Sequence, residues 1–380
     1  MKVVSWRLAG FVAALLLTQS AVAADAVPRP AIDAIFAAFK RHPIVGLGDA
    51  HGLAEEGEFY RRLIRDRRFA KDVGNVVFES AGAAHQATLD RYLNGADTPR
   101  AELRKVWSEV VGAVPTVTSV MYPEFLAEVR AVNQTLPPAR RIRVWAGEPP
   151  IDWSTIKSRA DLEPYMLQRA THPAALIERE ILGRGKKALV IYGGLHFYPL
   201  PTPPGFPPNL GQKGLVERRY PGAFFVIQPY YGFWQPGCAK TFESETQWPP
   251  ESLVTPIRGT PVQALLLRPG CTASPPPRRA PGAAPITPEE QARIEAGFAR
   301  PMSGADADAL LYLGPADALT RSTSDPDLLS DPVYAAEISR RLPIIGAPPD
   351  FISRLPFARL PYRATAVRGP TPQPPARPGP

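Results

Sequence analysis

The sequence predicts an α/β fold: a doubly wound, mostly parallel central sheet flanked by helices, in a single domain with proline-rich insertions. Short apolar runs alternate along the chain with stretches of helical periodicity, as they do in βαβ units. The composition, 44% hydrophobic and 21% charged, is near the globular average. It excludes a chain that is disordered throughout and one that spans a membrane many times.

The expected strands are short apolar runs, most of them rich in β-branched or aromatic residues, which suits burial on both faces of a sheet. They are residues 44–48, 76–78, 142–145, 188–192, 223–227, 262–267 and 309–313. Between them lie amphipathic stretches that we expect to be helices, at residues 55–69, 83–94, 124–136 and 174–182. Strands that alternate with helices pair in parallel.

Proline is over-represented, at 47 of 380 residues, about 12% against an average of roughly 5%. The prolines cluster at 199–208, at 275–288 and in the last residues. We therefore expect one domain over residues 25–368, with loops at the first two clusters, and a disordered tail at 369–380.

Residues 1–24 have the pattern of a secretion signal. Lys2 and Arg7 flank the start of a short apolar run at 8–17, and Ala-Val-Ala at 21–23 is a small-x-small cleavage pattern. The run is shorter than the about 20 residues that a membrane-spanning helix needs. We expect a periplasmic or secreted protein with no membrane span once the signal is cleaved.

Cys238 and Cys271 are the two cysteines of the chain. In an oxidising compartment an even pair predicts a disulfide bond. Such a bond would stabilise the fold by roughly 3–4 kcal/mol in the chain-entropy model. Neither cysteine has the CxxC spacing of a metal site.

The net charge is +8, and removing residues 1–24, with Lys2, Arg7 and no acid, leaves +6. Basic residues form no dense stripe interleaved with aromatic residues, so the charge does not predict nucleic-acid binding. The expected partner is a small-molecule or peptide substrate.

Four consecutive predicted strands each place an acid or a histidine just beyond their carboxyl end. Asp49 and His51 follow the first strand, Glu79 the second, Glu148 the third and His196 the fourth. The carboxyl ends of parallel strands share one edge of the sheet, where ligands bind. We therefore expect these side chains to converge.

Two imidazoles and several carboxylates support two kinds of chemistry. Without a metal, His51 would deprotonate water and His196 would donate a hydrogen bond to the developing oxyanion. Alternatively, His51, His196 and Glu79 would bind a divalent metal ion. The candidate catalytic residues are His51, Glu79, His196, Glu148, Asp49 and Glu55.

Other readings of these residues remain open. Asp49 could instead cap the following helix, and Glu148 could anchor the turn at Pro149. A nucleotide site is not expected: Gly46-x-Gly48 is similar to the start of a dinucleotide fingerprint, but His51 stands at the third glycine position and the carboxylate of Asp49 would repel a pyrophosphate.

At these residues the sequence resembles a superfamily that groups erythromycin esterases, ChaN-like haem-binding proteins and Tiki-type metalloproteases. The resemblance is carried by VGLGDAHG at 45–52 with Glu55, by the acid Glu79 after its strand and by the second Gly-x-x-His motif, which ends at His196. It covers about residues 40–200. Members usually have a glutamate where this chain has Asp49.

The resemblance implies a different role for these residues in each branch. The esterase branch implies that His51 activates water near Glu79 and His196, and the Tiki branch implies a divalent metal held by the two Gly-x-x-His motifs. The ChaN-like branch implies haem or iron, for which Tyr198, Tyr230, Tyr231 and His196 are the candidate ligands. The leading hypothesis is an exported hydrolase of an ester, lactone or amide. The alternatives are a haem- or iron-binding uptake protein and a scaffold with neither activity.

Overall fold

The computed structural model describes residues 25–112, 118–200, 208–233, 237–271 and 302–362, with Gln235, Thr287, Glu289 and Arg300. The predicted signal at 1–24 and the predicted tail at 369–380 lie outside the described residues. So does most of the two proline-rich stretches at 199–208 and 275–288.

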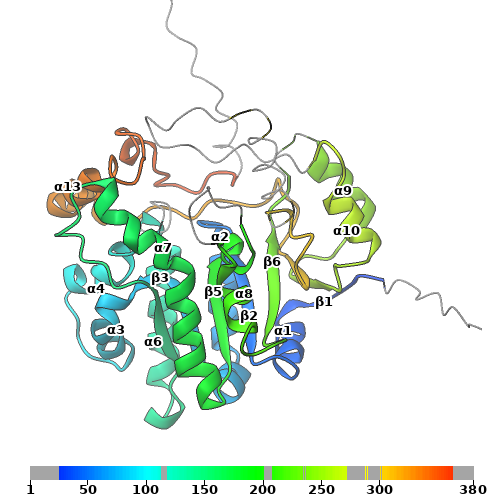
Figure 1. Cartoon of the computed structure of the whole chain (residues 1–380), viewed down its shortest axis with the longest axis horizontal. Coiled ribbons are helices and arrows are strands. Elements are labelled where there is room, and N and C mark those ends of the chain that lie inside the picture. The colour runs from blue at the N-terminus through cyan, green and yellow to red at the C-terminus, as the bar shows by residue number, and fades with distance from the viewer. Residues whose placement is uncertain are drawn as a thin grey trace, which may run out of the picture.

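The described residues form one sheet of eight strands in the order β1-β7-β8-β6-β2-β5-β3-β4. In this order, every neighbouring pair from β8 through to β4 is parallel, and the pairs β1–β7 and β7–β8 are antiparallel. This confirms the predicted mostly parallel sheet (Figure 1). The strands are β1 (Val27–Pro30), β2 (Ile44–Asp49), β3 (Asn75–Gly82), β4 (Arg143–Glu148), β5 (Ala188–Gly193), β6 (Phe224–Tyr230), β7 (Ser252–Thr255) and β8 (Ala309–Tyr312).

Helices cover both faces of the sheet. The α-helices are α1 (Ala31–Phe39), α2 (Ala54–Arg65), α3 (Gln86–Leu93), α4 (Arg100–Ser108), α6 (Met121–Gln134), α7 (Arg159–Leu176), α8 (Gly211–Glu217), α9 (Cys238–Thr246), α10 (Pro261–Leu266), α12 (Asp327–Ser330) and α13 (Pro332–Arg341). Short 3₁₀ and π turns are η1 (Phe69–Val73), η2 (Ala83–His85), η3 (Pro138–Arg140), η4 (Ile177–Ile181), η5 (Leu182–Arg184), η6 (Gly194–Phe197) and η7 (Ile352–Arg354).

Alternation along the central strands sends their side chains to two separate cores. In β5, Leu189 and Ile191 pack on the face covered by α1, α2 and α6, whereas Val190 and Tyr192 pack on the face covered by η4 and α8. In Figure 1, α7 lies in front of the sheet and α2 behind it. Burial on both faces explains why these strands are continuous apolar runs in the sequence.

The predicted strand at 262–267 is wrong, because this segment is α10. Pro261 stands at the start of the helix, where its missing N–H costs nothing. Val262 and Leu266, one helical turn apart, are both buried in the same cluster. An apolar run this short does not distinguish a strand from a helix by periodicity alone.

Several further elements differ from the prediction, and the helices α1, α4, α8, α9, α12 and α13 were not predicted. The helix expected at 174–182 begins at Arg159, because Pro164 and Pro173 lie inside α7 and interrupt its pattern. The strands β1 and β7 were not predicted. β1 contains Pro28 and Pro30 and forms the edge of the sheet, where proline is tolerated.

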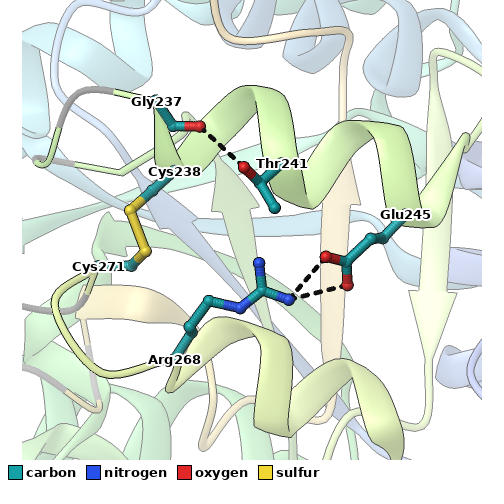
Figure 2. The surroundings of a disulfide bond; sticks show 6 residues. All are labelled: Gly237, Cys238, Thr241, Glu245, Arg268 and Cys271. Atoms are coloured by element: carbon teal, nitrogen blue, oxygen red, sulfur yellow. Dashed lines mark hydrogen bonds and ion pairs between the residues drawn. A yellow bond between two sulfur atoms is a disulfide. The ribbon is translucent and has the colours of Figure 1, made fainter.

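The predicted disulfide bond between Cys238 and Cys271 is present, with Cα atoms 5.7 Å apart. It ties the start of α9 to the turn after α10, as Figure 2 shows. Arg268 adds a second link between the same helices, with hydrogen bonds of 2.7 and 2.9 Å to the carboxylate of Glu245. The two helices therefore form one unit on the β7–β8 side of the sheet.

None of the helices in the described part of the chain has both the length and the apolar character to cross a bilayer.

Candidate functional site

The first part of the site is the turn that follows β2. Asp49 ends the strand, and its Oδ1 accepts a 2.7 Å hydrogen bond from the backbone N–H of His51. His51 has a φ of 53°, in the left-handed region that residues other than glycine rarely adopt. The short carboxylate of Asp49 thus stabilises an unusual backbone that sets the direction of the imidazole.

The Asp49 side chain also contacts the ring of His51. Its Oδ2 lies 3.3 Å from Nδ1 and accepts a 2.8 Å hydrogen bond from the hydroxyl of Tyr122 in α6. Burial alone would lower the pKa of His51, but the charges of Asp49 and, to a smaller extent, Glu79 outweigh it and raise that pKa to about 9. His51 is therefore mainly an imidazolium at neutral pH.

An acid missed by the sequence analysis, Glu56, lies behind this turn. Its Oε2 accepts a 2.9 Å hydrogen bond from the N–H of Ala50, and its side chain is fully buried. Burial and the nearby charge of Asp49 raise its pKa well above the usual value. Helical spacing from the buried Phe59, Tyr60 and Leu63 was a signal that Glu56 faces inward.

Glu55, one of the predicted site residues, is not brought to His51. Both of its carboxylate oxygens accept hydrogen bonds from Thr320, one from the backbone N–H at 2.9 Å and one from the hydroxyl at 2.6 Å. Glu55 therefore joins α2 to a segment near the end of the chain. The acid beside the turn that carries His51 is its neighbour Glu56.

Further bonds join the same C-terminal segment to the turn that carries His51. The hydroxyl of Tyr362 donates to the carbonyl of Ala50, and the N–H of Ser322 donates to the carbonyl of Gly52 at 2.8 Å. The N–H of Ala54 donates to the carbonyl of Thr320 at 3.0 Å. Residues 320–362 thus fix the backbone on both sides of His51.

Glu79 and His196 form the second part of the site. Oε1 of Glu79, a buried residue of β3, lies 3.4 Å from Nε2 of His196 in η6. Its Oε2 accepts a hydrogen bond from the N–H of Gly193 at the end of β5. Burial alone would raise the pKa of Glu79, but His196, His51 and Arg169 hold it well below its usual range.

The two parts meet at Gly193. A Cβ atom on this glycine would lie 2.8 Å from Nε2 of His51 and 3.3 Å from Oε2 of Glu79. Only glycine lets the end of β5 approach both groups. The predicted convergence of Asp49, His51, Glu79 and His196 at one edge of the sheet is therefore seen in the structure.

Glu148 reaches the site through Arg169, which the sequence analysis missed. Arg169 of α7 lies between two buried carboxylates: Nη2 is 2.5 Å from Oε1 of Glu79, and Nε is 2.9 Å from Oε1 of Glu148. Oε2 of Glu148 accepts a 3.1 Å hydrogen bond from the N–H of Val111. Burial raises the pKa of Glu148 despite the opposing charge of Arg169.

The arrangement does not fit a divalent metal on His51, His196 and Glu79. No group of three or more His, Cys, Asp or Glu side chains among the described residues has the geometry of a metal site. The oxygens of Glu79 are used by Arg169 and Gly193. The guanidinium of Arg169 supplies the positive charge that a metal ion would bring.

The tyrosines considered as iron ligands lie apart from one another. Tyr198 packs in the core under α8, and the hydroxyl of Tyr230 donates to Glu243 at 2.9 Å in the core near α9. The ring centroid of Tyr231 lies 6.1 Å from that of Tyr362, and both rings pack against the core on the face covered by α1, α2 and α6. Within the described residues, these phenols do not gather around His196.

Neither the family models nor the curated proteins contain a match to this chain. Solved structures similar to it include a protein of Bacillus cereus, with 14% identity over 55% of this chain and 73% of that one and a TM-score of 0.36. The type III effector HopBA1 matches with 15% identity, 56% and 88% coverage and a TM-score of 0.33. ChaN of Campylobacter jejuni, solved with cofacial haem, matches with 11% identity, 53% and 86% coverage and a TM-score of 0.30.

A ChaN protein is thus among the solved structures that are similar to this chain. The similarity is low in all three cases.

Proposed function

We propose that this chain is an exported hydrolase that cleaves an ester, lactone or amide bond at the edge of the sheet formed by the ends of β2, β3 and β5. One observation carries the proposal: His51 and Glu79 meet at Gly193, with His196 and Arg169 beside them. Export is supported by the signal pattern at 1–24 and by the disulfide bond, which persists in oxidising compartments.

In the proposed reaction His51 is the general base. Asp49 holds Nδ1, which leaves Nε2 to take a proton from water. The water oxygen forms a bond to the carbonyl carbon, and the carbonyl π electrons move to the oxygen. The electron pair on the oxyanion then re-forms the carbonyl as the bond to the leaving group breaks, and the imidazolium of His51 gives its proton to the leaving oxygen or nitrogen, so atoms and charge balance.

Arg169 supplies positive charge for the oxyanion, and the ring of His196 supplies a hydrogen-bond donor. Both contact Glu79, whose depressed pKa keeps it a carboxylate that orients them. Donors that are already fixed before the reaction need no reorganisation when charge develops. Glu148 positions Arg169 from its other side.

The test is hydrolysis of a panel of 4-nitrophenyl esters, lactones and anilides by the purified mature protein. His51→Ala is expected to lower kcat/KM by about 100-fold or more, the usual contribution of a general base. His42→Ala is the matched control, because that imidazole lies in a loop and bonds the carbonyl of Gly222 at 2.9 Å. Full turnover by a folded His51→Ala protein would refute the proposal.

Haem is added to the same preparations. A Soret shift that His196→Ala abolishes, without turnover of any substrate, would assign the chain to haem binding instead.

A further inference from the structure

A cavity of about 910 Å³ lies next to the proposed site, between α7, η6 and α8. Arg169 and His196 are part of its wall, and both contact Glu79. The cavity is therefore continuous with the place where the reaction is proposed. Its volume is in the range of about 300–1,000 Å³ that is typical of small-molecule sites.

The wall of this cavity is mainly aliphatic. One face of α7 contributes residues 159, 163, 166, 167 and 170, which follow helical spacing. Leu167 leaves 52% of its surface exposed, which is unusual for a large apolar side chain. The aliphatic residues of the wall are Met166, Leu167, Leu195, Leu200, Leu210 and Leu215.

Arg159 and Arg218 add two exposed positive charges to this wall. Among the described residues neither guanidinium has an ion pair or a hydrogen bond, although most arginines of the fold are paired. Glu163 is the one acid of the wall. Arg159, Arg218 and Glu163 leave a net charge of +1 (+2 − 1) around an apolar surface.

We propose that this cavity binds an amphipathic anion, with an aliphatic chain along α7 and α8 and a carboxylate paired with one of the two exposed guanidiniums of the wall, Arg159 at the start of α7 or Arg218 after the end of α8. Where the chain is a hydrolase, as proposed above, its substrates are then esters or amides that carry an aliphatic segment ending in a carboxylate. The reactive carbonyl lies at the inner end, beside Arg169 and His196. A cationic amphiphile is disfavoured by the same charges.

Binding is measured by calorimetry with dodecanoate as the probe and dodecylammonium as its cationic counterpart. The protein is the full mature chain with His51→Ala, so that turnover plays no part. Dodecanoate is expected to bind about tenfold tighter than dodecylammonium. Equal affinity for the two, or tighter binding of the cation, would overturn the proposal.

Two variants locate the probe in this cavity. The double variant Arg159→Gln/Arg218→Gln removes whichever guanidinium pairs with the carboxylate and is expected to weaken dodecanoate binding by about fivefold, as one exposed ion pair would contribute. Leu167→Glu places an acid on the apolar wall and is expected to weaken it by a similar factor or more. Arg67→Gln, an exposed arginine that lines a different groove, is the control and should leave the affinity unchanged. Unchanged binding in both cavity variants would refute the assignment.

The hydrolytic and binding proposals can fail separately. If the cavity variants weaken dodecanoate binding but the protein hydrolyses no ester, the binding site is supported and the hydrolase proposal is refuted. Conversely, the double variant could hydrolyse a 4-nitrophenyl monoester of dodecanedioate with an unchanged KM. That result would support the hydrolase proposal and refute the proposed binding site.

Discussion

His51 lies between the carboxylates of Asp49 and Glu79, and its chemistry follows from that position. With a pKa of about 9, only about 1% of its imidazole is neutral at pH 7. A base must be neutral to accept a proton, so the proposed reaction accelerates as the pH rises toward 9. At neutral pH the same ring is a cation that can attract an anionic substrate.

Asp49→Asn removes the main charge that raises this pKa. We expect the pKa of His51 to fall from about 9 toward its usual 6.5, because burial then acts with less opposition. The acid limb of the pH profile of kcat/KM should move down by the same amount. Asp350→Asn, on the exposed turn before η7, is the control. An acid limb that stays near pH 9 in Asp49→Asn would show that another group is the base.

Arg169 keeps two buried carboxylates, Glu79 and Glu148, close together. Its side chain is only 16% exposed, so solvent screens these pairs weakly. The removal of one partner from a buried charge cluster leaves the others uncompensated. The stability of this edge of the sheet therefore depends on Arg169 as much as the proposed chemistry does.

Arg169→Gln is expected to lower the free energy of unfolding by about 3–5 kcal/mol at pH 7. Because burial raises the pKa of Glu148, that carboxyl takes up a proton as the pH falls, and the loss should shrink in acid. Urea denaturation at several pH values measures both effects. Arg184→Gln removes an exposed pair with Glu180 and should cost less than about 1 kcal/mol. Equal losses in the two variants would contradict the buried-cluster interpretation.

At the scale of elements, α9 and α10 are joined by the disulfide bond and by Arg268 to Glu245 (Figure 2). They pack on β7 and β8 through Phe242, Trp248 and Leu266. The proposed catalytic groups lie instead at the ends of β2, β3 and β5. Stability and activity can therefore be separated in this part of the molecule.

The double variant Cys238→Ser/Cys271→Ser tests that separation. The free energy of unfolding should fall by about 2–5 kcal/mol, because the unfolded chain loses its cross-link. At temperatures where the protein remains folded, kcat and KM should be unchanged. Denaturant unfolding and steady-state kinetics on the same samples give the two quantities. A large loss of activity without a loss of stability would place the disulfide in the catalytic machinery.

At the scale of the whole molecule, the sequence predicts those helices and strands whose hydrophobic pattern can be recognised within a few neighbouring residues. The strands β2, β3, β4, β5 and β6 are apolar runs because both of their faces are buried, and the carboxyl ends of the first four carry the polar residues that converge. Periodicity also favours the amphipathic helices α2 and α6.

Residues that reach the site from distant parts of the sequence could not be predicted in the same way. Arg169 and Tyr122 reach the site from α7 and α6, and nothing near them in the sequence marks them as its residues. Glu55 and Glu56 are adjacent acids, and packing of α2 decides which one faces Asp49. Tertiary contacts also make α10 a helix where the apolar run alone suits a strand.

The turn around His51 depends on partners far along the chain: Glu55 bonds Thr320, 265 positions later, and Ala50 bonds Tyr362, 312 positions later. Synthesis from the amino end therefore produces the imidazole long before the groups that hold its backbone in place. A nascent chain lacks the finished turn around His51 until its last third has been made and has docked. The hydrolysis proposed above is then withheld from every incomplete copy of the protein.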